Sequence, residues 1–161
     1  MEPAFQLIVG QRVTQAANDK QQLVPLVETI EQQSGQKPQG VVVDSGYCSE
    51  DNLKYLDKRR IEGFVATEKQ QHAQRNESCK PGPLPIGASR VERMERKLQT
   101  KVGAAVYATR KCIVEPAFGQ IKQARGFRQF LVRGLEKVRG EWALICMTHN
   151  LLKFHKIICS G

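Results

Sequence analysis

The sequence lacks several features that would set its class. No stretch approaches the roughly 20 successive apolar residues that a membrane span needs, and residues 1–13 carry neither a basic n-region nor an apolar run of signal-peptide length. The five cysteines are scattered without a Cys-x-x-Cys pair, and the three histidines do not cluster with them. This spacing argues against a disulfide framework and against a zinc site. We therefore expect neither a membrane protein nor a secreted one, but a chain with reduced thiols.

What the sequence does have is an uneven positive charge. Its 161 residues are 40% apolar and 25% charged, the composition of one soluble globular domain. Residues 1–66 hold seven Lys and Arg against nine Asp and Glu, whereas residues 67–161 hold 18 against seven. A basic part of net charge +11 suggests a polyanionic partner, most often nucleic acid. A basic surface that serves only solubility is the alternative.

The N-terminal part alternates strand and helix signals. Apolar and polar side chains alternate over residues 4–14 and predict a strand. A helix is predicted to begin at Asn18-Asp19, with Asp19 as its cap, and to end near Ser34-Gly35. Pro25 should either kink this helix or mark its true first turn.

A second set of signals predicts a sheet that is at least partly parallel. The wholly apolar run at residues 40–43 is typical of a strand buried on both faces. Ser49 is a plausible N-cap of a following helix, and residues 63–66 predict another short strand. Strands that alternate with helices indicate an α/β fold.

The C-terminal part is basic and helical in character. Residues 67–89 are polar and rich in Pro and Gly, which predicts a loop. From there to residue 161 the chain shows helical spacing, with a long helix around residues 131–154 and breaks at Gly134 or Gly140. We expect one domain over residues 1–161, made of a sheet-and-helix part (1–66), this loop and a basic helical part (90–161).

One candidate for chemistry is Asp44. It stands at the carboxyl end of the predicted strand at residues 40–43, where ligands bind in α/β sheets. A carboxylate in that place can coordinate a hard cation such as Mg²⁺. The alternative is an aspartate that caps a turn.

A second candidate is a polar face of a predicted helix. At about 100° per residue, four polar side chains fall within about 80° of one another. They are Tyr107, Lys111, Glu115 and Lys122, and Arg110 lies beside them. Such a face suits a metal held by Glu115 and phosphates held by the lysines, or else a surface helix with a Lys111–Glu115 ion pair. Pro116 disfavours helical geometry at Glu115.

These residues carry a resemblance to a known family. The Asp44–Tyr47 motif, the Tyr107–Lys122 segment and the tail resemble the C-terminal part of bacterial insertion-sequence transposases of the DDE type. The tail motifs are Gly126–Arg128, Arg133–Trp142 and His149–Leu152. The resemblance covers nearly the whole chain.

The resemblance implies a ribonuclease H-like mixed sheet flanked by helices. It also implies that two aspartates and a glutamate hold two Mg²⁺ or Mn²⁺ ions for DNA cleavage and strand transfer. Asp44 matches the second aspartate and Glu115 the glutamate, while Tyr107, Arg110, Lys111 and Lys122 would contact DNA. The implied partners are transposon ends, target DNA and a second transposase chain, with no membrane. The implied location is the bacterial cytoplasm, at the nucleoid.

The match to the family signature is incomplete. The signature runs Tyr, two residues, Arg, three residues, Glu, six residues, Lys. Lys122 fits, but Arg110 keeps the spacing to Tyr107 and Lys111 keeps the spacing to Glu115, so either cation could take the arginine's role. No strand aspartate precedes Asp44, so we expect that the N-terminal strand or strands are missing and that the chain is an inactive transposase fragment.

Two functions of different classes remain open. The first is a DDE transposase core, and the second is a non-catalytic basic module that binds DNA or a full-length transposase. A degenerate reading frame whose product folds poorly is a third possibility.

The charge distribution generates a prediction about DNA binding. The chain should bind duplex DNA with little sequence preference, because lysines and arginines that neutralise phosphates release counterions. The logarithm of the affinity should then fall linearly with the logarithm of the salt concentration, by orders of magnitude over a few-fold rise. Fluorescence anisotropy at several salt concentrations measures this slope, and a flat slope would contradict the prediction.

Overall fold

The computed structural model describes residues 6–67 and 85–159, which form a mixed α/β structure. It contains five α-helices, a two-stranded sheet and two short helical turns within those residues. In chain order these are α1 (Leu23–Ser34), β1 (Gly40–Val43), the 3₁₀ turn η1 (Ser45–Tyr47), α2 (Glu50–Arg59), β2 (Glu62–Val65), α3 (Arg90–Gln99), α4 (Lys101–Gly119), the π-helical turn η2 (Gln120–Ala124) and α5 (Leu135–Cys159).

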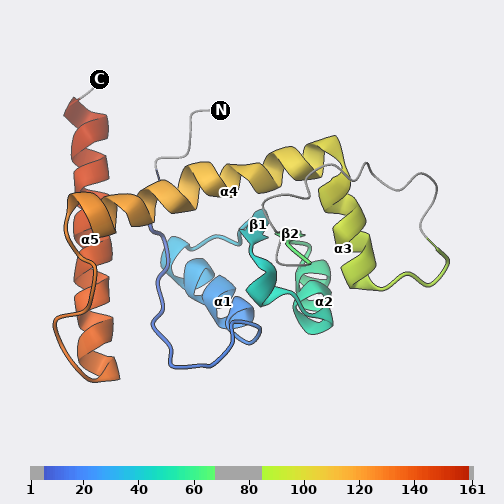
Figure 1. The fold of residues 1–161 in the computed structure, drawn as a ribbon, viewed down its shortest axis with the longest axis horizontal. Coiled ribbons are helices and arrows are strands. Elements are labelled where there is room, and N and C mark those ends of the chain that lie inside the picture. The colour runs from blue at the N-terminus through green and yellow to red at the C-terminus, as the bar shows by residue number, and fades with distance from the viewer. Residues whose placement is uncertain (1–5, 68–84, 160–161) are drawn as a thin grey trace.

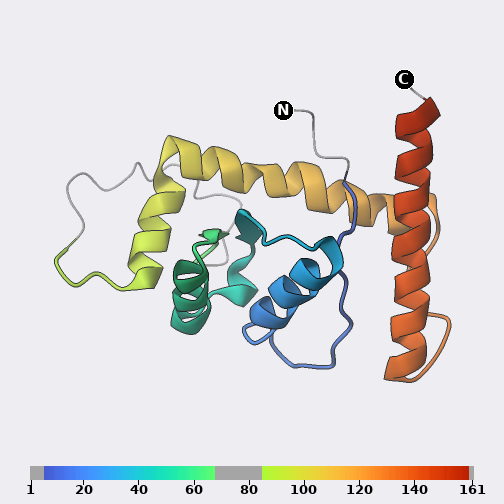
Figure 2. The same ribbon diagram turned by 180° about the vertical axis from the view of Figure 1, so that it is seen from behind.

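The arrangement is an α/β unit with a long helix laid across it. Helices α1 and α2 lie on one side of the small sheet, and α4 runs along the other side (Figure 1). Helix α3 descends from one end of α4, and α5 crosses the other end (Figure 2). No helix of the described residues is long and apolar enough for a membrane span.

The sheet confirms the central prediction of the sequence. Strands β1 and β2 pair in parallel, with Gly40 opposite Glu62 and Val43 opposite Val65. Helix α2 connects them, and its start is fixed by Ser49, whose side chain accepts a hydrogen bond from the backbone N–H of Asn52 at 3.2 Å. A strand–helix–parallel strand unit of this kind places the carboxyl ends of both strands at the same edge.

The core of this unit lies between the sheet, α1 and α2. The apolar stripes of both helices and the end of β2 supply it, as the helical spacing predicted. Its buried members are Leu23, Val27, Leu53, Leu56, Ile61 and Val65. Helix α1 begins at Leu23 rather than at Asn18-Asp19, and Pro25 lies in its first turn, where its missing N–H costs nothing.

The strand predicted at residues 4–14 is wrong over its described part, residues 6–14. This segment pairs with a helix instead of a strand. The amide of Asn150 on α5 accepts from the N–H of Ile8 and donates to its C=O, both at 2.8 Å, and His149 contacts the Gln6 carbonyl at 3.0 Å. Alternating side chains favour a strand only where a neighbouring strand supplies hydrogen bonds, and here Asn150 supplies them.

A tight corner joins α3 to α4. The Thr100 side chain accepts from the N–H of Gly103 at 3.0 Å and donates to the Lys97 carbonyl at 2.7 Å. A Cβ on residue 103 would lie 2.0 Å from that carbonyl oxygen, so only glycine fits there. Helix α3 itself starts with a complete capping box between Ser89 and Glu92. The loop expected at residues 67–89 falls mostly outside the described residues.

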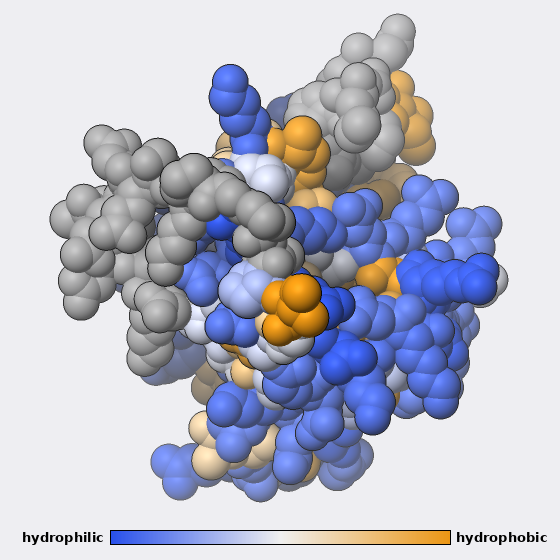
Figure 3. Space-filling view, turned by 90° about the vertical axis from the view of Figure 1, so that its right-hand side faces the viewer, coloured by the Kyte–Doolittle hydropathy of each residue, from blue (hydrophilic) through white to orange (hydrophobic). Residues whose placement is uncertain are grey.

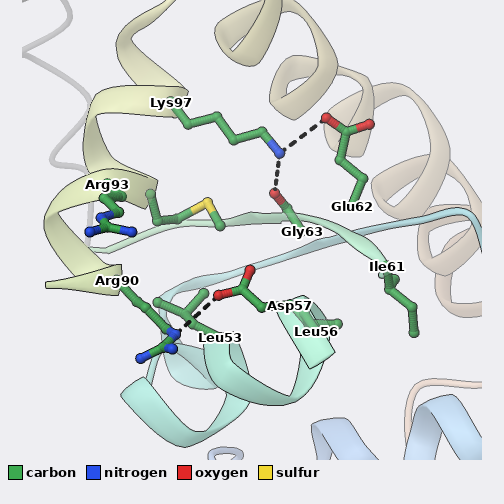
Figure 4. A pocket seen from close by; sticks show the side chains of 10 residues that line it. Leu53, Leu56, Asp57, Ile61, Glu62, Gly63, Arg90, Arg93 and Lys97 are labelled. Carbon is green, nitrogen blue, oxygen red and sulfur yellow. Dashed lines mark hydrogen bonds and ion pairs between the residues drawn. The ribbon is translucent and has the colours of Figure 1, made fainter. Parts of the chain in front are cut away.

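Basic residues of α3 hold it against the α/β unit. The Lys97 ammonium donates to the Gly63 carbonyl at 2.9 Å, pairs with Glu62 at 3.1 Å and lies 4.0 Å from the centre of the Phe64 ring. Arg90 pairs with Asp57 at 3.0 Å, across a pocket of about 270 Å³ (Figure 4). The end of the molecule that carries α3 is mostly hydrophilic (Figure 3).

Helix α5 is apolar on two opposite faces. It begins directly after Gly134 and continues unbroken through Gly140. One face buries Ile145, Cys146 and His149, and burial raises the pKa of the Cys146 thiol to about 11. The other face leaves several large apolar side chains exposed, among them Leu144, Met147, Leu151 and Ile158.

The contact between Asn150 and Ile8 generates a stability prediction. Asn150→Leu leaves the backbone N–H and C=O of Ile8 without their partners, which should lower the free energy of unfolding by about 1–2 kcal/mol. Gln32→Leu, at an exposed position of α1, should change it by less than about 0.5 kcal/mol. Urea unfolding followed by circular dichroism compares the two. Equal effects would mean that the N-terminal segment is not held by Asn150.

Candidate active site and nucleic-acid interface

Asp44 lies where the sequence predicted it, one residue beyond β1. It is the N-cap of the η1 turn, and its Oδ1 accepts from the N–H of Gly46 at 3.2 Å. Its side chain is nevertheless 45% exposed, at the carboxyl edge of the sheet. The turn-capping role and an accessible carboxylate at the strand end are therefore both present.

Helix α4 brings Arg110 to this carboxylate, with Tyr107 hydrogen-bonded to Arg110. The Arg110 Nη2 lies 3.5 Å from the Asp44 Oδ2, and the Arg110 Nη1 donates to the Tyr107 hydroxyl at 3.3 Å. Both groups are partly exposed, so the ion pair contributes at most about 1 kcal/mol to stability. The ion pair matters more for orientation. It holds the side of α4 that carries Tyr107 and Arg110 toward the carboxyl end of β1.

Asp19 is an unexpected neighbour of Asp44. A Cβ placed on Gly46 would lie 3.3 Å from a carboxylate oxygen of each aspartate, so both flank the η1 turn. Burial raises the pKa of the Tyr47 hydroxyl, and the negative charges of Asp19 and Asp44 raise it further. The buried Asn52 amide holds this arrangement, since it donates to the Lys20 and Tyr47 carbonyls at 2.7 Å.

The prediction that Asp19 caps α1 is therefore wrong. The helix begins four residues later, and no side chain accepts from its first N–H groups. Only the backbone carbonyl of Asp19 takes part in the turn, where it accepts from the N–H of Gln22 at 2.9 Å. The sequence contains no local signal for the position of the Asp19 carboxylate, because the contact with the η1 turn joins segments 25 residues apart.

Glu115 does not join this cluster. It lies five residues after Arg110, about 140° around the helix and about 7.5 Å along it. It is exposed, and its side chain makes no hydrogen bond or ion pair within the described residues. Lys111 shares this outer side of α4 and is also exposed, without an ion pair to Glu115. Helix α4 thus presents the predicted site residues on two different sides.

Pro116 does not interrupt the helix next to Glu115. Helix α4 continues through it to Gly119. Proline has no N–H for the carbonyl four residues earlier, which belongs to Cys112. The side chain of Gln6 fills that gap by donating to the Cys112 carbonyl at 2.9 Å. The N-terminal segment thus supplies the hydrogen bond that α4 lacks near Glu115.

The carboxylates do not form the metal site that the resemblance implies. No group of three or more Asp, Glu, His or Cys side chains in residues 6–67 and 85–159 could hold a metal ion. Asp19 and Asp44 flank one turn, Arg110 lies against Asp44, and Glu115 faces elsewhere. This donor set does not fit a pair of Mg²⁺ or Mn²⁺ ions, each of which needs several oxygen ligands.

Lys122 belongs to a second cluster, at the end of α4. It lies in the η2 turn, which is π-helical, and its ammonium is 5.6 Å from the centre of the Phe118 ring. Phe118 in turn stacks on Trp142 of α5. The Lys122 side chain is exposed, and its contact with a DNA phosphate stays a prediction.

An accessible carboxylate at the carboxyl end of a parallel strand lies where α/β proteins bind ligands. The comparison with known protein families is more specific than this geometry. Residues 1–151 match the model of the transposase DDE domain family, and the chain belongs to this family. The resemblance drawn from the sequence is thereby confirmed. Neither a curated protein nor a solved structure matches the chain.

The exposed lysines generate a prediction about the DNA-binding surface. Replacement of Lys111 and Lys122 by Gln should weaken DNA binding and make the salt slope shallower by up to about two, because two phosphate contacts are lost. The fold should stay intact, since exposed lysines contribute little to stability. Anisotropy titrations measure both effects.

The matched control removes the same charge elsewhere. Lys54 and Lys58 are exposed lysines of α2, away from α4, and their replacement by Gln should change the slope less. If both double variants weaken binding equally, the DNA is attracted by net charge and not held by this face.

Proposed function

We propose that this chain is a DNA-processing domain of a DDE transposase with a ribonuclease H-like fold, which binds transposon ends and target DNA. The observation that carries the proposal is the contact of Arg110, itself hydrogen-bonded to the Tyr107 hydroxyl, with Asp44 at the carboxyl end of β1. It joins the family's strand-end aspartate to its signature helix. The parallel unit of β1, α2 and β2 supports the proposed fold, and the net charge of +9 supports the DNA partner.

Arg110 rather than Lys111 takes the role of the signature arginine in this proposal. Arg110 faces the aspartate, whereas Lys111 lies on the outer side of α4. A guanidinium offers five N–H donors, and here only two of its nitrogen atoms are used. The remaining donors can bind a backbone phosphate beside Asp44, in the planar geometry that arginine favours.

The carboxylates that act in the family chemistry are Asp44 and Glu115 in this proposal. Asp44 lies at the end of β1, facing the Arg110 side of α4, whereas Glu115 lies on the outer side of that helix. These positions support no metal-dependent step. What the chain's own residues can do in this arrangement is bind and orient DNA. Lys111 on the outer side of α4 and Lys122 in the η2 turn neutralise phosphates, and Arg110 pairs with the strand-end carboxylate.

A second candidate function is favoured by the separation of Asp44 from Glu115. Separated carboxylates suit a non-catalytic module that binds DNA or a second transposase chain. Either function places the protein with DNA, and thus in the bacterial cytoplasm at the nucleoid. The two functions differ in whether strands are cleaved.

A nicking assay separates them. With Mg²⁺ or Mn²⁺ and supercoiled DNA that carries the element's ends, we expect the chain to bind the DNA without detectable nicking, because Glu115 is not gathered with Asp44. Glu115→Gln and Asp44→Asn are compared with Glu95→Gln, an exposed carboxylate of α3. Nicking that disappears in the first two variants alone would show that the carboxylates do assemble on DNA. Absence of DNA binding would contradict the proposed function itself.

A further inference from the structure

A histidine and a cysteine lie side by side at the C-terminal end of α5, outside the site described above. The Cys159 Sγ is 3.6 Å from the His155 Nε2, and both side chains are exposed. This end of α5 projects past α4, on the side opposite the α/β unit (Figures 1 and 2). The pair is therefore separate from the strand-end carboxylate and from the basic face of α4.

The spacing of the two residues makes them a chelating pair. Residues four apart lie on the same face of a helix, and ligands at i and i+4 are how a helix holds Zn²⁺ in the His-Glu-x-x-His motif. The sequence argued against zinc because it contains no Cys-x-x-Cys pair. On a helix, the four-residue spacing of His155 and Cys159 brings a thiol and an imidazole together as well.

The distance between the two donor atoms matches a tetrahedral metal centre. Zinc lies about 2.3 Å from a cysteine sulfur and about 2.0–2.1 Å from a histidine nitrogen, and structural zinc sites are tetrahedral. Two such ligands at the tetrahedral angle stand about 3.6 Å apart, which is the separation found between Sγ and Nε2. A thiolate and an imidazole also favour Zn²⁺ over Mg²⁺, which prefers oxygen ligands.

The pair supplies half of a metal site. In residues 6–67 and 85–159 no group of three or more Asp, Glu, His or Cys side chains could hold a metal ion, so no third donor of these types completes the pair there. A structural zinc site takes four protein ligands, and two cysteines with two histidines are one of its usual sets. Two copies of the pair supply that set.

The surroundings of the pair suit a second copy of the chain. Leu151 and Leu152, one helical turn before His155, are 66% and 58% exposed, and Ile158 beside Cys159 is 77% exposed. Large apolar side chains that gather on an exposed surface mark an interaction site. A copy joined through the metal would cover them, and an apolar shell controls the access of water to a metal centre.

We propose that His155 and Cys159 form a half-site for Zn²⁺, which two copies of this chain complete as one centre of two cysteines and two histidines on a two-fold axis. Each thiol loses its proton to solvent when its sulfur binds the metal, and each neutral imidazole binds through the lone pair of Nε2. Such a centre differs in ligands and in place from the Mg²⁺ or Mn²⁺ site of the family. It goes beyond the proposed function and does not depend on it.

Cobalt in place of zinc provides the first readout. The full chain, reduced and freed of metal, is titrated with Co²⁺. Tetrahedral Co²⁺ bound to thiolate should give a charge-transfer band in the near ultraviolet and visible bands that saturate at about one metal per two chains, since four ligands are needed. Zn²⁺ should displace the cobalt and remove the bands, whereas an excess of Mg²⁺ should leave them unchanged.

The molar mass provides the second readout. Light scattering after size exclusion, with a reductant present throughout, should show a twofold rise in molar mass with Zn²⁺ and a return to the single chain with a chelator. The metal, and not a disulfide, then joins the two copies.

Variants assign the metal to this pair. His155→Gln and Cys159→Ser should each lose the cobalt bands and the rise in molar mass, because each substitution removes two of the four ligands. Cys112→Ser is the matched control, an exposed free thiol of α4, and it should keep both. Because the replaced side chains are exposed, the circular dichroism spectrum of all three variants should stay unchanged.

The other outcomes overturn the proposal. Cobalt bands that persist in both His155→Gln and Cys159→Ser would place the metal elsewhere. Saturation at one metal per chain without a rise in molar mass would show that the centre is not shared between copies. A dimer that forms without metal and disappears with a reductant would be a disulfide. Failure of the chain to bind DNA, by contrast, would contradict only the proposed function.

Discussion

The corner between α3 and α4 is the constraint on which the rest of the arrangement depends. Gly103 packs so closely on the Lys97 carbonyl that no side chain fits, and Thr100 closes the turn with two hydrogen bonds. Because Lys97 also anchors α3 to β2, the corner fixes the direction in which α4 leaves the α/β unit. That helix carries Arg110 over the strand end and Lys111 on its outer side, and it leads into the η2 turn with Lys122.

Positive charge serves two different purposes in this fold. On α3, Arg90 and Lys97 are bound to carboxylates and to a backbone carbonyl, so they hold the helix in place. On α4 and η2, Lys111 and Lys122 are exposed and pair with no carboxylate in the described residues. The two pairs of residues contribute equally to the net charge. Only their packing in the structure distinguishes the cations that hold helices together from those that are available to phosphate.

The sequence was informative wherever a feature is local. The apolar run at residues 40–43, the Ser49 cap and the Asp44 turn were all predicted, since neighbouring residues determine them. Residues 6–14 and Asp19 were misjudged, because their partners, Asn150 and the η1 turn, lie far away along the chain. The rotation of about 100° per residue predicted that the polar residues of α4 share one face. It could not predict which side of the helix faces the sheet.

The η2 turn gives the end of α4 a register of its own. The N–H of Arg125 bonds to the Gln120 carbonyl, five residues earlier, so each residue advances less around the axis than in an α-helix. Deletion of a single residue from Gln120–Ala124 would restore α-helical hydrogen bonding and rotate Phe127, Phe130 and the connection to α5 by about one residue's turn. The length of this turn therefore sets the direction in which every residue beyond it faces, which spacing counted along an ideal α-helix does not give.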